Sequence, residues 1–504
     1  MAQTDPRLTA PGGSQRVAPG QVGANPLADA VSDPASPRPV SNGDPEGVPL
    51  VTTTRSWPVP TWRLAAALLL VGLTTLFFAT GALAAWLVGN LVVVALAVAD
   101  WALAPSPAAV GVRRDVEAVL VMDVPSPLRW TLQNPAGRAV TVDLADALPP
   151  SLRIPDRRAR MRLPAGGRGV ENQTVTPARR GTVTLGPITL RSHGPLGLMM
   201  RQADADVTTR VRVHPAFPSR DTAELALQQS KRQAEGLRTV RLRGQGTDFE
   251  ALRDYTPDDE SRRIDWAATA RALKPIVRTY RAERNQQVLI LLDHGRTMAG
   301  RMARLAVTDV DERREGVAPR LEHAMDAAMA LTRVATGMGD RVGLVTFSDT
   351  VGASIPPRTG SAQLTRVVQT LADVKIDLVE PDYRGAFVDA LVRYRRRALV
   401  VVLTDLAAAP VSESLAPAVP LLSRRHLLVV ASPADPTVQQ WSKGPPQDPR
   451  AAYRMAAALL AAADRRHSAG LLRGAGAQVV DAAPDVLPSR LIDTYLDLKS
   501  AGRL

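Results

Sequence analysis

The stretch 288–297 reads VLILLDHGRT, and it decides the fold of the second half of the chain. Val288 to Leu292 is a continuous apolar run rich in branched side chains, which is typical of a strand buried on both faces of a parallel sheet. Asp293 follows where such a strand should end, and Gly295 and Thr297 come two and four residues later. An acid and a hydroxyl on a loop leaving a strand can direct several oxygens to one point. The stretch therefore predicts a candidate Mg²⁺ or Mn²⁺ site.

Buried strands and amphipathic helices alternate from this stretch to the end of the chain, and Asp405 directly follows another apolar run, in LVVVLTDL. The expected strands are Val288–Leu292, Val342–Phe347, Ala398–Leu403, His426–Ala431 and Gln478–Val480, and the expected helices are Leu321–Thr336, Gln363–Leu371, Ala451–Leu472 and Leu487–Lys499. Such alternation is typical of a doubly wound parallel sheet, which binds ligands beyond the carboxyl ends of its strands. We therefore expect an α/β domain over residues 286–504, in which Asp293 and Asp405 can face each other.

The chain begins with a segment that cannot fold alone. Residues 1–58 are rich in Pro, Gly, Ser, Ala and Asp and nearly lack aromatic side chains. Such a composition buries too little apolar surface to offset the loss of chain entropy, so we expect a disordered N-terminal tail.

Two uncharged apolar runs follow the tail, at Leu64–Thr80 and Ala82–Ala99, with Gly81 between them. Both runs are within the usual range for spanning a bilayer, which takes about 20 residues. Trp62 and Trp101 lie at the two ends that would share one interface, as an aromatic belt requires. The pattern predicts a two-helix transmembrane hairpin over residues 59–104.

Basic residues flank this hairpin on both sides, whereas the turn between the helices carries no charge. Arg55 and Arg63 precede it, and Arg113 and Arg114 follow it. The positive-inside rule therefore places both termini in the cytoplasm, with the protein as a multi-pass membrane protein.

Residues 105–220 show short alternating apolar runs punctuated by Pro and Gly, which favours a small β-sandwich. Thr182–Leu185, the turn Gly186-Pro187 and Ile188–Leu190 together predict a β-hairpin. Nothing in this part of the sequence indicates catalysis.

Composition and motifs restrict the function classes. The formal net charge is +13, but only five of the 62 basic residues are lysines, and no basic motif is interleaved with aromatic residues for stacking bases. A specific nucleic-acid partner is therefore not expected. The chain has no cysteine, and it lacks the phosphate-binding, dinucleotide-binding, nucleophile-elbow and HExxH motifs. We therefore expect a protein that is not an enzyme.

The residues at the expected strand ends form a recognisable pattern. The run Asp293-His294-Gly295-Arg296-Thr297 follows the first strand, and Asp405 follows a central one. This arrangement resembles a von Willebrand factor type A domain, whose metal-ion-dependent adhesion site begins with D-x-S-x-S and includes a later Thr and Asp. Gly295 replaces the first serine, and the stretch 382–386 has no threonine. The resemblance implies a depleted Mg²⁺ or Mn²⁺ site of Asp293, Thr297 and Asp405, completed by water.

The segment before the first strand, residues 221–285, is dense in charged and aromatic residues. Positions 245–266 read QGTDFEALRDYTPDDESRRIDW. This F-x-x-L-R-x-Y-x-P-x-D-x-x-R-x-I-D-W pattern is similar to the signature of the bacterial family called domain of unknown function 58. The run GPLGL at 194–198 also resembles the family's D-P-L-G-L, with Gly194 in place of the Asp. The signature residues that we single out are Arg253, Tyr255, Pro257, Asp259, Arg262, Asp265, Trp266 and Arg271.

These residues are expected to form a cluster of ion pairs, because the planar guanidinium favours bidentate contacts with carboxylates. The expected pairs join Arg253, Arg262 and Arg271 to Asp254, Asp259 and Asp265, under Tyr255 and Trp266. Such a cluster either joins the β domain to the α/β domain or presents a surface to a partner, and the sequence leaves both interpretations open.

The resemblance also implies a function. Proteins of this family are commonly encoded with a MoxR-type AAA+ ATPase, so we expect a membrane-anchored cytoplasmic scaffold or adaptor that binds such an ATPase. The alternative hypothesis is a metal-dependent hydrolase that uses the Asp-rich run before the first strand.

Overall fold

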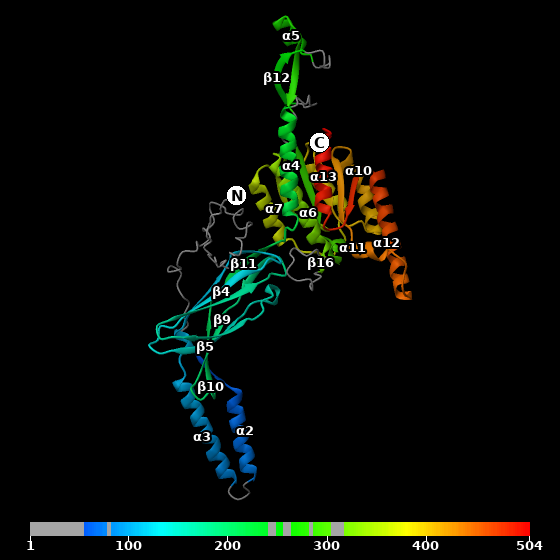
Figure 1. Ribbon diagram of the computed structural model, residues 1–504. Helices are drawn as coiled ribbons and strands as arrows, with labels where there is room; N and C mark the ends of the chain where they lie inside the picture. Colours follow the sequence, from blue (N-terminus) through cyan, green and yellow to red (C-terminus); the bar gives the residue numbers. More distant parts are fainter. Residues whose placement is uncertain (1–54, 78–81, 240–247, 256–263, 282–285, 304–316) are drawn as a thin grey trace, which may run out of the picture. The chain divides into compact units, whose positions relative to one another are not determined.

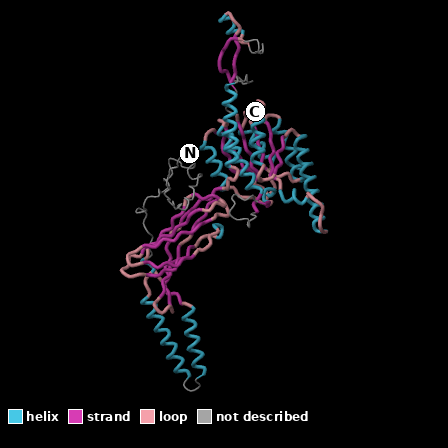
Figure 2. Tube along the Cα trace, viewed as in Figure 1, coloured by secondary structure: helices cyan, strands magenta, loops and turns pink. Residues whose placement is uncertain are grey.

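The computed structural model describes residues 55–77, 82–239, 248–255, 264–281, 286–303 and 317–504. These residues form a multidomain protein of mixed α and β structure (Figure 1, Figure 2). Nearly all of the predicted N-terminal tail lies outside the described residues.

Two apolar helices follow strand β1 (Trp57–Pro60): α2 (Trp62–Phe77) and α3 (Ala82–Leu103), which pack against each other. By length and hydropathy, one segment of the described chain, Leu83–Ala109, is long enough to cross a membrane, and Trp62–Thr74 is a shorter apolar helix. The two apolar runs predicted from the sequence are thus confirmed as helices, of which one meets the requirement for a span.

Helix α3 is joined to the β domain through a buried carboxylate. Asp100 accepts hydrogen bonds from the backbone N–H groups of Leu196, Leu198 and Met199 at 2.6, 2.7 and 2.8 Å. A Cβ at Gly194 would lie 2.3 Å from Asp100 Oδ1, so an aspartate does not fit at position 194. The GPLGL run therefore wraps around an acid that α3 supplies.

The β domain has ten strands in addition to β1. They are β2 (Gly111–Val116), β3 (Val119–Val121), β4 (Ser126–Gln133), β5 (Val140–Asp146), β6 (Arg158–Leu163), β7 (Arg168–Val175), β8 (Gly181–Leu185), β9 (Ile188–His193), β10 (Met199–Ala205) and β11 (Thr209–His214). They pair in three sheets, ordered β1-β10-β9-β5-β6, β3-β11-β8 and β2-β4-β7. Alternate residues of these strands enclose an apolar core around the buried indole of Trp130, as expected of a sandwich.

The β-hairpin predicted at 182–190 is wrong. Strands β8 and β9 both form, but β8 pairs with β11 whereas β9 pairs with β10 and β5, in a different sheet. The Gly186-Pro187 dipeptide is a corner between sheets. Its backbone packs closely on Ala147, since Gly186 N donates to Ala147 O at 3.1 Å and a Cβ at Gly186 would lie 2.9 Å from Ala147 Cβ.

The β domain contacts the α/β domain through Arg180, which forms a buried ion pair with Glu322. The Arg180 guanidinium also donates to the carbonyl oxygens of Leu371 at 3.1 Å and Val374 at 2.5 Å. Burial lowers the pKa of Arg180 to about 10, still well above neutral pH. The side chain therefore remains charged in this contact.

The α/β domain is built on a six-stranded sheet ordered β18-β17-β14-β19-β20-β21. Its strands are β14 (Gln287–Asp293), β17 (Arg341–Phe347), β18 (Val351–Arg358), β19 (Leu399–Leu403), β20 (Leu427–Pro433) and β21 (Gln478–Ala482). All pair in parallel except the edge strand β18, which is antiparallel to β17. A short ribbon of β15 (Arg301–Ala303) and β16 (Val317–Pro319) follows β14 in the chain.

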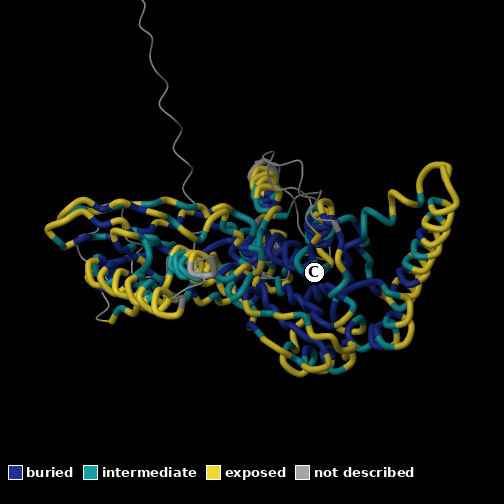
Figure 3. The backbone as a smooth tube through the Cα atoms, turned by 90° about the horizontal axis from the view of Figure 1, so that it is seen from below, coloured by how far each residue is buried: buried dark blue, intermediate teal, exposed yellow. Residues whose placement is uncertain are grey.

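Helices cover both faces of this sheet. One face packs on α6 (Arg320–Gly337), α7 (Ser361–Asp373) and α13 (Leu487–Ser500), and the other on α8 (Tyr383–Arg393), α10 (Ala416–Ser423) and α12 (Pro449–Gly474). The shorter helical segments are η4 (Arg296–Ala299), α9 (Ala408–Pro410), a π-helical turn (Val411–Leu415) and α11 (Pro436–Trp441). Buried residues gather in the interior and exposed ones on the outside (Figure 3). The central strands and helix α6 are mostly buried, whereas helix α12 is mostly exposed or half-buried.

The strands and helices predicted from hydrophobic periodicity in this domain are confirmed within a few residues at each end. The antiparallel strand β18 and helix α8 were not predicted. The burial of residues along β18 alternates little because β18 is an edge strand. Helix α8 begins at Tyr383, within the stretch 382–386 that was compared with the threonine loop of the type A pattern.

Candidate functional site

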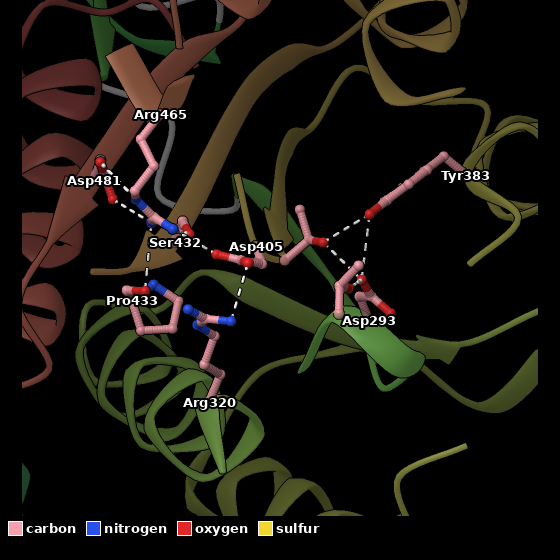
Figure 4. Close-up of polar contacts among 10 residues, drawn as sticks. Asp293, Arg320, Tyr383, Asp405, Ser432, Pro433, Arg465 and Asp481 are labelled. Atoms are coloured by element: carbon pink, nitrogen blue, oxygen red, sulfur yellow. Dashed lines mark hydrogen bonds and ion pairs between the residues drawn. The ribbon is translucent and has the colours of Figure 1, made fainter. Parts of the chain in front are cut away.

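The candidate site lies at the carboxyl ends of the central strands, as predicted. Asp293 is the last residue of β14, and Thr404 and Asp405 directly follow the neighbouring strand β19. Parallel pairing of the two strands brings these ends to one edge of the sheet. Asp293 and Asp405 are both buried, at 0% and 4% exposure, and they belong to two distinct polar clusters (Figure 4).

The hydroxyl cluster consists of Asp293, Thr297, Tyr383 and Thr404. Asp293 Oδ2 accepts hydrogen bonds from Thr404 Oγ1 at 2.6 Å, Thr297 Oγ1 at 3.1 Å and the Tyr383 hydroxyl at 3.3 Å. Asp293 Oδ1 accepts from the backbone N–H of Gly295 at 2.7 Å. The two oxygens of the carboxyl group thus receive four donors from the protein itself.

The electrostatics of the hydroxyl cluster follow from its burial. Desolvation raises the pKa of Asp293, and the hydrogen bonds from Thr404, Gly295 and Thr297 oppose this shift only in part. Burial, together with the neighbouring Asp293, also raises the pKa of Tyr383 well above its ordinary value. The phenol is therefore a permanent hydrogen-bond donor, and it lies 2.9 Å from Thr404 Oγ1.

The arginine cluster consists of Asp405, Arg320, Arg465 and Asp481. Asp405 Oδ1 accepts from Arg465 Nη1 at 2.6 Å, and Asp405 Oδ2 lies 3.2 Å from Arg320 Nη1. Arg465 Nη2 also lies 2.6 Å from Asp481 Oδ1. The carboxylate that the sequence assigned to a metal is therefore neutralised by two guanidinium groups.

These residues do not fit a Mg²⁺ or Mn²⁺ ion. Such an ion needs several oxygens whose lone pairs face one open point. Here the oxygens of Asp293 are occupied by donors and those of Asp405 face two positive charges. Among the described residues, no group of three or more His, Asp or Glu side chains is arranged to hold a metal ion.

A loop at 377–382 packs against the segment 294–296 that follows Asp293, and its residues 377–380 are exposed. Its backbone is fixed by two hydrogen bonds: Asp377 N donates to His294 O at 2.9 Å, and Arg296 N donates to Val379 O at 2.8 Å. Arg296 also forms an ion pair with Glu380. Leu378 nevertheless points outward and is 75% exposed.

The signature segment forms a separate small unit. Strands β12 (Asp248–Asp254) and β13 (Ile276–Arg281) pair antiparallel, with helix α5 (Trp266–Ala272) between them in the chain. Pro257, Asp259 and Arg262 lie outside the described residues, as do the ion pairs expected of them.

Three of the signature residues, Asp265, Trp266 and Arg271, belong to helix α5 or its N-cap. Asp265 caps helix α5 by accepting from the backbone N–H of Ala267 and Ala268, and Arg271 Nε donates to the carbonyl of Ala267. Trp266 is 71% exposed. Because Asp259 and Arg262 lie outside the described residues, the ion-pair cluster that includes Arg271 and Trp266 stays a prediction.

Several residues of the site carry no sequence signal strong enough to single them out. In the sequence, Thr404 is marked only by its position before Asp405, and Tyr383 lies in the stretch 382–386, where the type A pattern has a threonine. Arg320, Arg465 and Asp481 come from distant parts of the chain. An arginine among 62 basic residues gives no local sign of its partner.

The role of Asp293 as an acceptor can be tested by two substitutions. Asp293→Ala leaves the Thr404, Tyr383 and Thr297 hydroxyls without their acceptor in a buried site. We expect a loss of about 2–3 kcal/mol of stability. Asp293→Asn keeps an acceptor for Gly295 N, and its amide can donate to the hydroxyls after they rotate, so we expect a loss below about 1 kcal/mol.

Hydrogen exchange of β14 and β19 peptides in the full-length protein in detergent measures both effects segment by segment. Equal losses of stability in Asp293→Ala and Asp293→Asn would show that the negative charge of Asp293, and not its hydrogen-bond acceptors, stabilises the cluster.

Comparison with known proteins gives a family match for part of the chain. Residues 251–441 match the family described as "Protein of unknown function DUF58". The "Uncharacterized protein Rv1480" of Mycobacterium tuberculosis and the "Uncharacterized protein Mb1516" of Mycobacterium bovis are each 29% identical to this chain over 166 residues, which is 32% of this chain and 48% of the relative. The chain thus spans about half the length of the curated relatives it matches.

Solved structures give only weak likenesses. The CARDB domain of the PF1109 protein of Pyrococcus furiosus, solved in complex with di-metal ions, aligns with 22% of this chain and 90% of its own, at 12% identity and a TM-score of 0.16. Proximal thread matrix protein 1 of the mussel byssus aligns with 43% of this chain and 46% of its own, at 10% identity and a TM-score of 0.24. Scores this low carry no argument about fold or function.

Proposed function

We propose that this chain is a membrane-anchored scaffold that binds a protein partner, a MoxR-type AAA+ ATPase, at the strand-end edge of its α/β domain. The match of residues 251–441 to the DUF58 family and the resemblance to a von Willebrand factor type A domain support this proposal. Both the central β14 and the antiparallel edge strand β18 agree with such a type A domain. The partner is inferred from the resemblance alone.

The anchor in this proposal is a hairpin of α2 and α3, with both chain termini in the cytoplasm. The exposure of apolar side chains such as Leu69, Leu83 and Leu91 supports it, since soluble proteins rarely expose contiguous apolar surface on this scale. Arg201 lies over the ring of Trp101, 4.8 Å from its centroid, where the helix meets the β domain. A tryptophan beside a cation is typical of the membrane interface.

The observation that best supports a binding role is that the Asp293 carboxyl group is buried and fully hydrogen-bonded, whereas the neighbouring loop at 377–382 is exposed. A hydrolase needs a general base or nucleophile that a substrate can reach. Asp293 is fully buried with both oxygens engaged, whereas Leu378, Arg296 and Glu380 are accessible above it. An exposed apolar residue flanked by charges is typical of a protein contact surface, with a polar rim around an apolar centre.

A binding measurement with purified full-length protein in detergent tests the proposal. Leu378→Asp should weaken binding of a MoxR-type ATPase by about tenfold or more, because a buried apolar contact is replaced by an unpaired charge. Val392→Asp is the matched control, since Val392 is also exposed but lies in the last turn of α8, which leads into the start of β19 at the opposite edge of the sheet. Equal affinities for the native chain and both variants would exclude this edge as the binding surface.

A further inference from the structure

The positive charge at the carboxyl ends of β19, β20 and β21 comes from a side chain of helix α12. Arg465 reaches the end of β19 through Asp405, the end of β20 through Ser432 and Pro433, and β21 through Asp481 (Figure 4). Its side chain is 17% exposed, so these contacts are made largely out of water.

The Arg465 guanidinium uses all three of its nitrogens. Nη1 donates to Asp405 at 2.6 Å, and Nε donates to Asp481 Oδ2 at 3.3 Å. Nη2 donates to Asp481 Oδ1 at 2.6 Å, to Ser432 Oγ at 2.9 Å and to the carbonyl oxygen of Pro433 at 3.4 Å. These hydrogen-bond acceptors are the oxygen atoms of two carboxylates, a hydroxyl and a carbonyl.

Carboxylate, hydroxyl and carbonyl oxygens are also the ligands that a hard divalent cation prefers. Two carboxylates converging from different strands repel each other unless a positive charge lies between them. Although burial opposes the charged form of Arg465, its contacts with Asp481 and Asp405 outweigh burial and hold its pKa above the ordinary arginine value. The guanidinium is therefore a permanent positive charge at this position.

We propose that Arg465 is a built-in cation, which takes the place of a divalent metal at the strand-end edge. Arg320 completes the arrangement by placing a second guanidinium 3.2 Å from the other oxygen of Asp405. The edge keeps its shape without Mg²⁺ or Mn²⁺, and any partner that binds there does so in the presence of a chelator. This inference concerns the chemistry of the site and holds whether or not an ATPase is the partner.

The test uses the full-length protein in detergent and the variant Arg465→Ala. Arg466→Ala is the matched control, because Arg466 is the next residue of α12, is exposed and donates only to the carbonyl of its own helix residue Ala462. We expect Arg465→Ala to lower the melting temperature by roughly 5–10 °C and Arg466→Ala to change it by no more than about 1 °C.

Manganese provides the second measurement. The native chain should show no Mn²⁺ binding by electron paramagnetic resonance below about 1 mM, and EDTA should leave its melting temperature unchanged. Arg465→Ala leaves the oxygens of Asp405, Asp481, Ser432 and Pro433 facing a gap, so this variant should bind Mn²⁺ at least about tenfold more tightly than the native chain and regain part of its lost melting temperature.

Three results would overturn the proposal. The first is a single Mn²⁺ site in the native chain whose occupancy raises its melting temperature. The second is an Arg465→Ala variant as stable as Arg466→Ala, and the third is an Arg465→Ala variant that gains no affinity for Mn²⁺. If Arg465→Ala does not fold, Arg465→Lys and Arg465→Gln replace it. The lysine variant keeps a positive charge between the carboxylates and should have the higher melting temperature of the two, and equal melting temperatures would overturn the proposal.

Discussion

Replacing Arg114 with methionine is expected to destabilise the β domain by about 3–5 kcal/mol, because the change leaves a buried carboxylate without its counter-charge. Arg114 lies on β2 with its side chain fully buried, and its guanidinium binds Asp146 through Nε at 2.8 Å and Nη2 at 2.5 Å. Trp130 Nε1 donates to the same carboxylate at 2.8 Å. Burial raises the pKa of Asp146 even with these partners. Without Arg114, the Asp146 carboxyl group either takes up a proton or reaches water through unfolding of the β domain, and both cost stability.

Hydrogen exchange of β4 peptides in the full-length protein measures this loss in the β domain itself, since exchange reports the free energy of opening segment by segment. Arg129→Met is the matched control: Arg129 is an exposed arginine on β4, and its loss should cost no more than about 0.5 kcal/mol. The double variant Arg114→Met, Asp146→Leu removes both charges and should recover most of the loss. A double variant as unstable as Arg114→Met alone would show that packing, and not the charge left behind, sets the cost.

Replacing Asp326 with asparagine is expected to stabilise the α/β domain at neutral and alkaline pH. Asp326 lies in helix α6, and its Oδ1 accepts from the backbone N–H of Ser219 at 3.2 Å and from Ser219 Oγ at 2.7 Å. Burial raises the pKa of this carboxyl from 3.8 to about 7, against the lowering effect of Ser219. The folded state therefore holds a proton that the unfolded state releases at lower pH.

The sign of the pH dependence follows directly. Between the unfolded pKa of 3.8 and the folded pKa of about 7, the folded state binds more protons, so its stability falls as the pH rises. Above the folded pKa the full penalty of an ionised buried carboxylate applies, which amounts to at most about 4 kcal/mol. Asparagine keeps the acceptor for Ser219 and never ionises, so the penalty is absent from the variant at every pH.

Melting curves by circular dichroism from about pH 5 to about pH 8 test this expectation. The melting temperature of Asp326→Asn should exceed that of the native chain by an amount that grows across this range. Asp493→Asn is the control, since Asp493 is exposed on α13 of the same domain. A constant difference between Asp326→Asn and the native chain would contradict the assignment of a raised pKa to Asp326.

Local sequence patterns were enough to predict the buried strands and the apolar helices. Hydrophobic periodicity located β14, β17, β19 and β20 because these strands are buried on both faces, and burial on both faces selects continuous apolar runs. The apolar helices α2 and α3 were located by their uncharged apolar runs, although many of their side chains are exposed. Asp293 and Asp405 could be assigned to one edge of the sheet, since parallel strands all end there.

The sequence alone could not assign partners across long distances. Residues 182–190 contain two strands and a turn, yet only the packing of Gly186 on Ala147 decides that the strands join different sheets. From the sequence, Asp405 could be either a metal ligand or an ion-pair partner, because an acidic residue after a strand can serve both roles. Tertiary structure decided between them by laying helix α12 over the strand ends and directing Arg465 at Asp405, and no local pattern encodes which distant arginine arrives there.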